Sequence, residues 1–407
     1  MAVGDDRIRK YFLFKAITSF SLWMPFWTLW AYENVKNMFL LTVVDAAFWI
    51  TMVAFQIPAG LLGDKYGRKV MLFLGEVIAC VGVLAFGLST QFSEYLFANM
   101  IWATGLCLVV SGDTPYLYDT LVELKRQTEF ISIMAKSAAI TSVVVAVACV
   151  AGGALVQGTN PHRLDLTLII SSLVALTGSL TAVLLKEPKV VRTKVSEYRK
   201  HLKEGLRRVL TTRAILVLIM FQIVVEIAIY VMAVFRSVYM NEVLDLNYLQ
   251  IGVLIGAFTI SGGIVLTQGG KIEHSLGEKR SLLFMLVAII GSFTVVFLVK
   301  SPVAILVQFL IYGVSYLQSP IISGYMNKRV DSSHRSTVVA IASMMFTLFL
   351  TPIELLFGWL ANEWDTTLSL LILAIAVTPA GFYLLSLWYR IIDSEQSVKR
   401  ERTLRHF

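Results

Sequence analysis

The sequence has 407 residues, of which 57% are hydrophobic and 15% are charged, and its mean hydropathy is +0.73. A soluble domain carries about 25% charged residues, so this chain has too few charges to cover a water-facing surface and is predicted to be a membrane protein. The net charge of +8 does not indicate a nucleic-acid-binding protein, because the basic residues lie in short segments between apolar stretches.

Twelve apolar segments follow one another along the chain, each long enough for a bilayer-spanning helix of about 20 residues. Most connections are short, which predicts antiparallel neighbours, and the basic stretch 187–213 divides the segments into six and six. The sequence therefore predicts an all-α membrane protein embedded in a lipid bilayer. The segments are 11–32, 39–62, 70–90, 94–121, 129–158, 164–186, 214–240, 248–270, 280–299, 302–327, 336–361 and 366–391.

Lysine and arginine are distributed unevenly between the two ends of these segments. With the N-terminus assigned to one side, 29 of the 35 basic residues fall on that side, in loops, linker and tail. Positively charged loops stay in the cytoplasm. Both termini and the linker are therefore predicted to be cytoplasmic, in a multi-pass protein of the inner or plasma membrane.

The connection after the second segment, GLLGDKYGRK at 60–69, has a weaker copy, GGKIEHSLGEKR at 269–280. In each copy two glycines lie seven residues apart and are followed by basic residues, and the copies are offset by 210. Gly153 and Gly358 repeat with an offset of 205. The sequence therefore predicts a duplicated six-helix unit, with halves at 1–186 and 214–407 and a cytoplasmic basic linker at 187–213. Such repeats are common in transporters.

Residues 60–69 resemble the loop signature of the major facilitator superfamily, G-x-x-x-D-(R/K)-x-G-(R/K)-(R/K), at every defined position. The loop lies between the second and third spans, as in that family, and SGDTPYLYDTL at 111–121 is similar to the end of the fourth helix in a prokaryotic branch of it. The resemblance implies the major facilitator fold, two pseudo-symmetric six-helix bundles. It also implies a secondary active transporter of a small organic solute that works by alternating access.

The resemblance assigns a conformational latch to the signature. Gly60 and Gly67 would allow close helix approach and a tight turn, Asp64 would meet the N-terminal end of span eleven, which favours an anion, and Arg68 would pair with Asp64 and Asp119. The alternative is that these charges only fix the topology. The family's antiporter pattern, G-P-x-x-G-G, lacks its first glycine and its proline at 148–153, which weakens an assignment as an exporter without excluding it.

Ionisable groups inside the spans mark candidate substrate and proton sites, because each costs about 3 kcal/mol to insert. Glu226 lies near the middle of span seven, and Gln222 and Tyr230 share its helix face at four-residue spacing. We expect Glu226 to bind substrate or a proton; a protonated packing residue is the alternative. Proton coupling is expected because buried acids outnumber buried bases.

Asp113 in span four and Lys136 in span five lie at similar depth, about 12 Å from the same end at 1.5 Å per residue. They are predicted to pair, or else Lys136 binds an anionic substrate. Gln318 occupies the equivalent stretch of span ten and joins the predicted substrate or proton site.

Three further charges, Asp45, Arg236 and Glu354, lie in the outer thirds of spans two, seven and eleven. They are predicted to form bridges that close an outer gate. The alternative is that each extends to the membrane interface.

The sequence contains no phosphate-binding loop, metal-ligand cluster or nucleophile triad, so no enzyme activity, cofactor or metal is expected. The expected partners are a small-molecule substrate, protons and lipid, without nucleic acid, and the expected state is a monomer. Import and export stay open. The alternatives to a proton-coupled transporter are a proton-independent facilitator and a transport-inactive sensor or scaffold.

Overall fold

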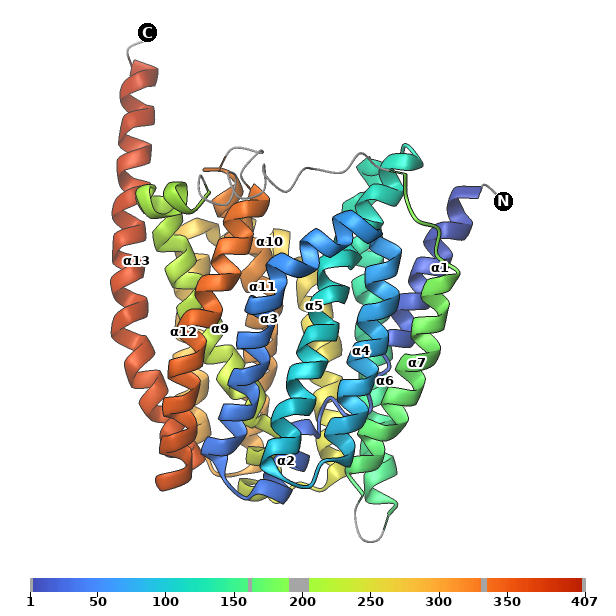
Figure 1. The fold of residues 1–407 in the computed structure, drawn as a ribbon. Helices are drawn as coiled ribbons and strands as arrows, with labels where there is room; N and C mark the ends of the chain where they lie inside the picture. Colours follow the sequence, from blue (N-terminus) through green and yellow to red (C-terminus); the bar gives the residue numbers. More distant parts are fainter. Residues whose placement is uncertain (1–2, 160–162, 190–204, 331–334, 405–407) are drawn as a thin grey trace. The chain divides into compact units, whose positions relative to one another are not determined.

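The computed structural model describes residues 3–159, 163–189, 205–330 and 335–404, which form helices and connections without a strand among them. Figure 1 draws the helices along the chain. They are α1 (Val3–Thr18), α2 (Trp27–Val35), α3 (Met38–Tyr66), α4 (Arg68–Leu88), α5 (Phe92–Glu123), α6 (Phe130–Gln157), α7 (Asp165–Val183), α9 (Arg213–Val238), α10 (Tyr248–Leu298), α11 (Leu306–Asn327), α12 (Arg335–Glu363) and α13 (Thr366–Leu404).

The predicted spans are recovered with two differences. Ten helices of the described chain are long and apolar enough to cross a membrane. One of them, α10, holds the predicted spans 248–270 and 280–299, joined at a kink where Gly277 has φ 71°. The first predicted span, 11–32, is divided between α1 and α2. The all-α prediction is confirmed, and the twelve apolar segments correspond to these elements.

The first span is broken at residues 19–26. Pro25 has no backbone N–H and disfavours helical backbone at the preceding residue, which favours a break in this segment. The broken segment is bonded to the neighbouring helices: Leu22 N donates to Ser171 Oγ on α7 at 2.9 Å, and the hydroxyls of Ser19 and Thr141 lie 3.3 Å apart. Irregular backbone at membrane depth needs such partners within the protein.

The chain forms two compact units that differ from the two predicted halves. Unit 1 contains Met1–Val195, Phe235–Gly263 and Thr351–Glu363, and unit 2 contains Ser196–Val234, Ile264–Leu350 and Trp364–Phe407. Three helices, α9, α10 and α12, therefore contribute to both units. The division into halves at 1–186 and 214–407, with the linker 187–213, stays a prediction. Of that linker, 190–204 lie outside the described residues and 205–211 are helical.

Unit 1 is built around closely packed helices. The helix α4 packs on α5 and α7, and α3 packs on α5, as Figure 1 shows. Between α4 and α5 a Cβ at Gly75 would lie 2.8 Å from the carbonyl oxygen of Gly105, so the two backbones approach as only glycine permits. We call the end of unit 1 at the Gly67 turn the signature end, and the end at the α2–α3 turn the far end.

The repeated glycines of the sequence occupy equivalent positions at the far end of unit 1. A Cβ at Gly153 on α6 would lie 2.6 Å from the carbonyl oxygen of Tyr248 on α10. On α12, Gly358 is packed just as tightly against the side chain of Thr42 on α3. Each glycine lets a helix of one predicted half approach a helix of the other.

Candidate functional site

The turn between α3 and α4 gathers the charges of the signature. Nη2 of Arg68 lies 2.6 Å from Oδ1 of Asp64, and its Nε lies 3.8 Å from Oδ2 of Asp119 on α5. The Glu187 carboxylate accepts hydrogen bonds from Arg68 N at 2.8 Å and Lys69 N at 2.7 Å, so a negative charge caps the start of α4. Both ion pairs implied by the resemblance are present. Their role as a latch, and the contact of Asp64 with span eleven, stay predictions.

The two signature glycines have different surroundings. Gly67 has φ 105° and ψ 154°, a backbone conformation that is essentially restricted to glycine. The close approach predicted for Gly60 is wrong, because that face of α3 is open: a Cβ there would meet no described atom within 4 Å. At Gly63, three residues further on, a Cβ would lie 2.7 Å from Nη1 of the Arg68 side chain. The missing side chain at Gly63 leaves room for the guanidinium.

Replacing Gly67 with alanine is expected to lower the unfolding free energy by about 1–3 kcal/mol, the cost of a side chain in this backbone region. The new Cβ would also lie 2.6 Å from Oε1 of Glu187, which caps α4. Thermal unfolding in detergent measures the effect. The matched control is Gly60→Ala, which should be neutral or stabilising. Within a helix, alanine is more stabilising than glycine by about 0.5–1 kcal/mol. Equal destabilisation by both changes would contradict the assignment.

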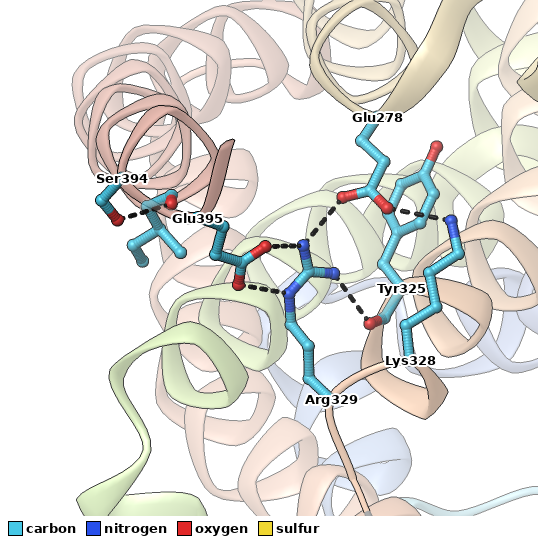
Figure 2. Close-up of polar contacts among 7 residues, drawn as sticks. Glu278, Tyr325, Lys328, Arg329, Ser394 and Glu395 are labelled. Atoms are coloured by element: carbon cyan, nitrogen blue, oxygen red, sulfur yellow. Dashed lines mark hydrogen bonds and ion pairs between the residues drawn. The ribbon is translucent and has the colours of Figure 1, made fainter. Parts of the chain in front are cut away.

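The second half has its own charged cluster at the corresponding turn (Figure 2). Arg329, which follows α11, donates to Glu395 on α13 through Nε at 2.9 Å and Nη2 at 2.7 Å, and to Glu278 at 3.2 Å. The guanidinium lies 4.7 Å from the Trp388 ring centroid, and Lys328 Nζ donates to Glu278 at 2.9 Å. The charge that follows the turn glycine is opposite in sign in the two halves, because Glu278 follows Gly277 whereas Arg68 follows Gly67. The sequence prediction omitted this cluster, although Glu278 follows the turn glycine as Arg68 does.

The substitution Arg329→Lys is expected to lower the melting temperature of the protein in detergent. A lysine ammonium cannot make the two parallel bonds to Glu395 or stack as a planar group on Trp388. We expect a loss of about 1–2 kcal/mol, because Glu395 is 41% exposed and its ion pair is partly screened. The control is Lys328→Ala, whose side chain is 58% exposed and should be nearly silent. A silent Arg329→Lys would show that the cluster adds no stability.

Asp113 binds α1 and not α6. Its Oδ2 lies 2.8 Å from Nζ of Lys15, and its Oδ1 accepts a 2.9 Å hydrogen bond from the hydroxyl of Tyr11. The predicted Asp113–Lys136 pair is therefore wrong. Asp113 and Lys136 do lie on α5 and α6. Lys136, however, is on an exposed face of α6, and the partners of Asp113 come from α1. Counting residues along a helix did not show which face of the helix each side chain occupies.

A second carboxyl belongs to the same cluster and was missed. Glu76 on α4 is partly buried and interacts electrostatically with both Lys15 and Asp113. The cluster of Tyr11, Lys15, Glu76 and Asp113 thus holds two carboxyls and one ammonium within the spans of unit 1. The available signal was an acid in the middle of the apolar segment 70–90, the same signal that identified Glu226.

Glu226 lies on α9 within unit 2, on the least buried face of that helix. Nε2 of Gln222 lies 3.4 Å from Oε2 of Glu226, and the Tyr230 ring meets Phe346 edge to face with centroids 6.3 Å apart. All three predicted residues are partly exposed, while most of their neighbours on α9 are buried. Gln318 on α11 is 5% exposed, and its Oε1 has no hydrogen-bond partner among the described residues. The polar stripe of α9 is therefore an accessible face with a carboxyl at its centre.

The three charges of the predicted outer gate all fall in unit 1. Asp45 lies on α3, Arg236 near the end of α9 and Glu354 on α12, and they are 3%, 6% and 0% exposed. Their burial excludes the alternative that each side chain extends to the interface. Their role as a gate stays a prediction.

Known proteins show what this chain is similar to. A family model described as Major Facilitator Superfamily matches residues 12–352. Multidrug resistance protein 2 of Bacillus subtilis (strain 168) is 25% identical over 252 residues, 60% of either chain, so this match spans less than two thirds of that relative. An uncharacterised MFS-type transporter of the same organism, YxaM, is 18% identical over 404 residues, covering 97% of this chain and 98% of the relative.

Solved structures support the fold. The crystal structure of a mutant of the nucleoside transporter NupG has a TM-score of 0.81 at 13% identity and covers 94% of this chain and 100% of its own. A bacterial homologue of the human lysosomal transporter Spinster, inward-facing and unoccupied, has a TM-score of 0.79 at 12% identity, covering 96% and 98%. At these identities the likeness concerns the fold alone.

Proposed function

Because the chain belongs to the major facilitator superfamily, we propose that it is a secondary active transporter that moves a small organic solute across a bacterial plasma membrane by alternating access. The family and its matched relatives make the chain a multi-pass membrane transporter and not an enzyme. The proposal adds the class of solute, the coupling to protons and the roles of individual residues.

One observation carries the proposal: each unit places carboxyl groups inside its apolar spans in a partly accessible setting. Unit 1 holds the Lys15–Asp113 pair with Glu76 beside it, and unit 2 holds Glu226 with Gln222. Ionisable groups in membrane spans are costly and characteristic of substrate and ion pathways. A helix held together by packing alone has no need of them.

We assign proton coupling to Glu226, because its hydrogen-bonding neighbour in the described chain is the neutral Gln222, and a carboxyl in apolar surroundings binds a proton readily. Gln222, Tyr230 and Gln318 supply polar contacts for the solute. Lys136, exposed on α6 and not bound to Asp113, is placed to meet an anionic group of a substrate.

The signature residues act in this proposal as a latch. Arg68 bound to Asp64 and Asp119 holds the α3–α4 turn to α5, and breaking these pairs would accompany the change of access. Positive-inside topology places this turn, the linker and both termini in the cytoplasm. The outer gate of Asp45, Arg236 and Glu354 then lies at the opposite, external end. We propose that the protein works as a monomer.

A substrate screen in proteoliposomes, with and without a pH gradient, tests the proposal. Relatives described as multidrug resistance proteins make drug-like organic solutes the first compounds to test, in both the uptake and the export direction. Flux that grows with the pH gradient supports proton coupling. Flux that ignores the gradient identifies a proton-independent facilitator. Neither flux nor binding, in correctly oriented protein, identifies a sensor or scaffold and overturns the proposal.

A further inference from the structure

The first turns of α3 run antiparallel to the last turns of α12 at the far end of unit 1. Three contacts define this register: Met38 N donates to Oδ1 of Asn362 at 3.3 Å, Gly358 packs against Thr42, and Glu354 interacts with Asp45. Residue numbers rise along one helix as they fall along the other. Of the three contacts, the one between the two carboxyls therefore lies farthest from the helix ends.

Glu354 has an unusual environment for a glutamate. Its side chain is fully buried, no described donor reaches either carboxyl oxygen, and the Asp45 carboxyl lies within hydrogen-bonding reach. The charged group that acts on it is the Asp45 carboxyl, which is 3% exposed. Two ionised carboxyls at such a place would repel each other with little water to screen them.

Charge balance indicates what compensates this pair. Four charged side chains are buried in the described part of the chain: Asp45, Asp165, Arg236 and Glu354. Asp165 is paired with Arg163 at 2.5 Å, which leaves two carboxyls and one guanidinium. A guanidinium keeps its charge in a protein. With both carboxyls ionised, these three buried groups of unit 1 carry one negative charge in excess, and one added proton makes the set neutral.

Two polar side chains on the neighbouring helices make contacts with groups other than Glu354. From α5, the neutral amide of Asn99 donates to the carbonyl of Val44 at 2.8 Å. From α2, Glu33 is bound by the hydroxyl of Tyr248 at 3.1 Å. Asp45 and Arg236 each have an interaction partner within the protein, whereas no described donor reaches the Glu354 carboxyl. Glu354 is therefore the carboxyl that we assign the proton to.

We propose that the Asp45–Glu354 pair binds one proton and that this proton clasps α3 to α12. Release of the proton from the Glu354 carboxyl to the adjoining aqueous medium leaves a carboxylate beside Asp45, and their repulsion separates the two helix ends. Pro352, two residues earlier, interrupts the hydrogen bonding of α12 and provides a hinge. This inference rests on the proposed function, in which opening of the far end is one of the two states of access.

Distance measurements between spin labels test the clasp without any substrate. Cysteines replace Phe39 and Glu363, both exposed and next to the Met38–Asn362 contact, and the native cysteines are buried. In lipid nanodiscs we expect a short separation at low pH and a second, longer population that grows as pH rises. With Glu354→Gln, which keeps the shape of a protonated carboxyl, only the short separation should remain at every pH. The control, Glu94→Gln, removes an exposed carboxyl of the same unit and should keep the full pH response.

Two further measurements separate the outcomes. Asp45→Asn leaves one carboxyl for one guanidinium, so it should also abolish the pH response. Infrared difference spectra should lose one protonated-carboxyl band in Glu354→Gln. An unchanged pH response in Glu354→Gln, or no response in the parent protein, overturns the clasp even if transport is found. A normal response in a protein that transports nothing leaves the clasp standing and overturns the proposed function instead.

Discussion

Replacing Glu226 with glutamine is expected to abolish proton-driven accumulation of the solute. A pH gradient of one unit is worth about 1.4 kcal/mol per proton, which drives roughly tenfold accumulation when one proton moves with each solute. Glutamine cannot carry that proton, so the accumulation ratio should fall to about one. Shape and the contact with Gln222 are conserved, so folding should be preserved.

The measurement that isolates coupling compares two fluxes in the same proteoliposomes. Accumulation against a gradient should vanish in Glu226→Gln, while exchange of labelled for unlabelled solute, which needs no net proton movement, should continue. The matched control is Glu94→Gln, which removes an exposed carboxyl outside the proposed site. If Glu226→Gln still accumulates solute tenfold under the pH gradient, the proton is carried elsewhere, and the Lys15–Asp113–Glu76 cluster becomes the candidate.

The spans were predictable because hydropathy and length decide which segments enter a bilayer, and neither depends on the partners of a helix. The break in the first span was harder to foresee. Pro25 was visible in the sequence, but proline occurs within long helices too, as Pro58 in α3 and Pro115 in α5 do. The difference is that hydroxyls of Ser171 and Thr141 are present to support an unwound segment. That support depends on tertiary packing.

Partner choice was the weakest part of the sequence prediction, for a geometric reason. Counting residues gives depth at 1.5 Å per residue, and on that basis Asp113 and Lys136 were predicted to pair. Successive side chains on a helix point in directions 100° apart. The rotation of the whole helix about its own axis therefore decides which side chains face a given neighbour, and packing sets that rotation. The same ambiguity hid Gly63, where the missing Cβ matters, behind Gly60, where it does not.

The outer charges illustrate the opposite case. Asp45, Arg236 and Glu354 were grouped only because each lies near the same predicted end of its span, yet all three are buried in unit 1. A charge in an apolar helix end has few stable positions: it reaches water or is buried with polar partners. What depth could not show is that two like charges adjoin, from which the protonated clasp follows.

Loss of the Lys15–Asp113 pair is also expected to lower the stability of the protein. In Asp113→Asn the ammonium of Lys15 keeps its charge and loses its ion-pair partner, and the Glu76 carboxyl is left to interact with it electrostatically. We expect a loss of about 2 kcal/mol, below the roughly 3–5 kcal/mol of a fully buried pair, because the two side chains are 23% and 19% exposed and are partly screened. The Tyr11 hydroxyl bond to the same carboxyl is weakened as well.

A double-mutant cycle distinguishes this pair from a merely polar site. Lys15→Met alone leaves the carboxylates of Asp113 and Glu76 without the ammonium and should also destabilise the protein. Lys15→Met with Asp113→Asn removes both charges of the pair, so melting in detergent should show most of the stability restored and a coupling energy of at least about 1 kcal/mol. Transport should not return, since the double variant lacks the charges proposed to face the solute or proton. Lys136→Met is the matched control and should leave the melting temperature unchanged, because its ammonium is exposed. Equal destabilisation by Lys136→Met and Lys15→Met would restore the pairing that the sequence first predicted.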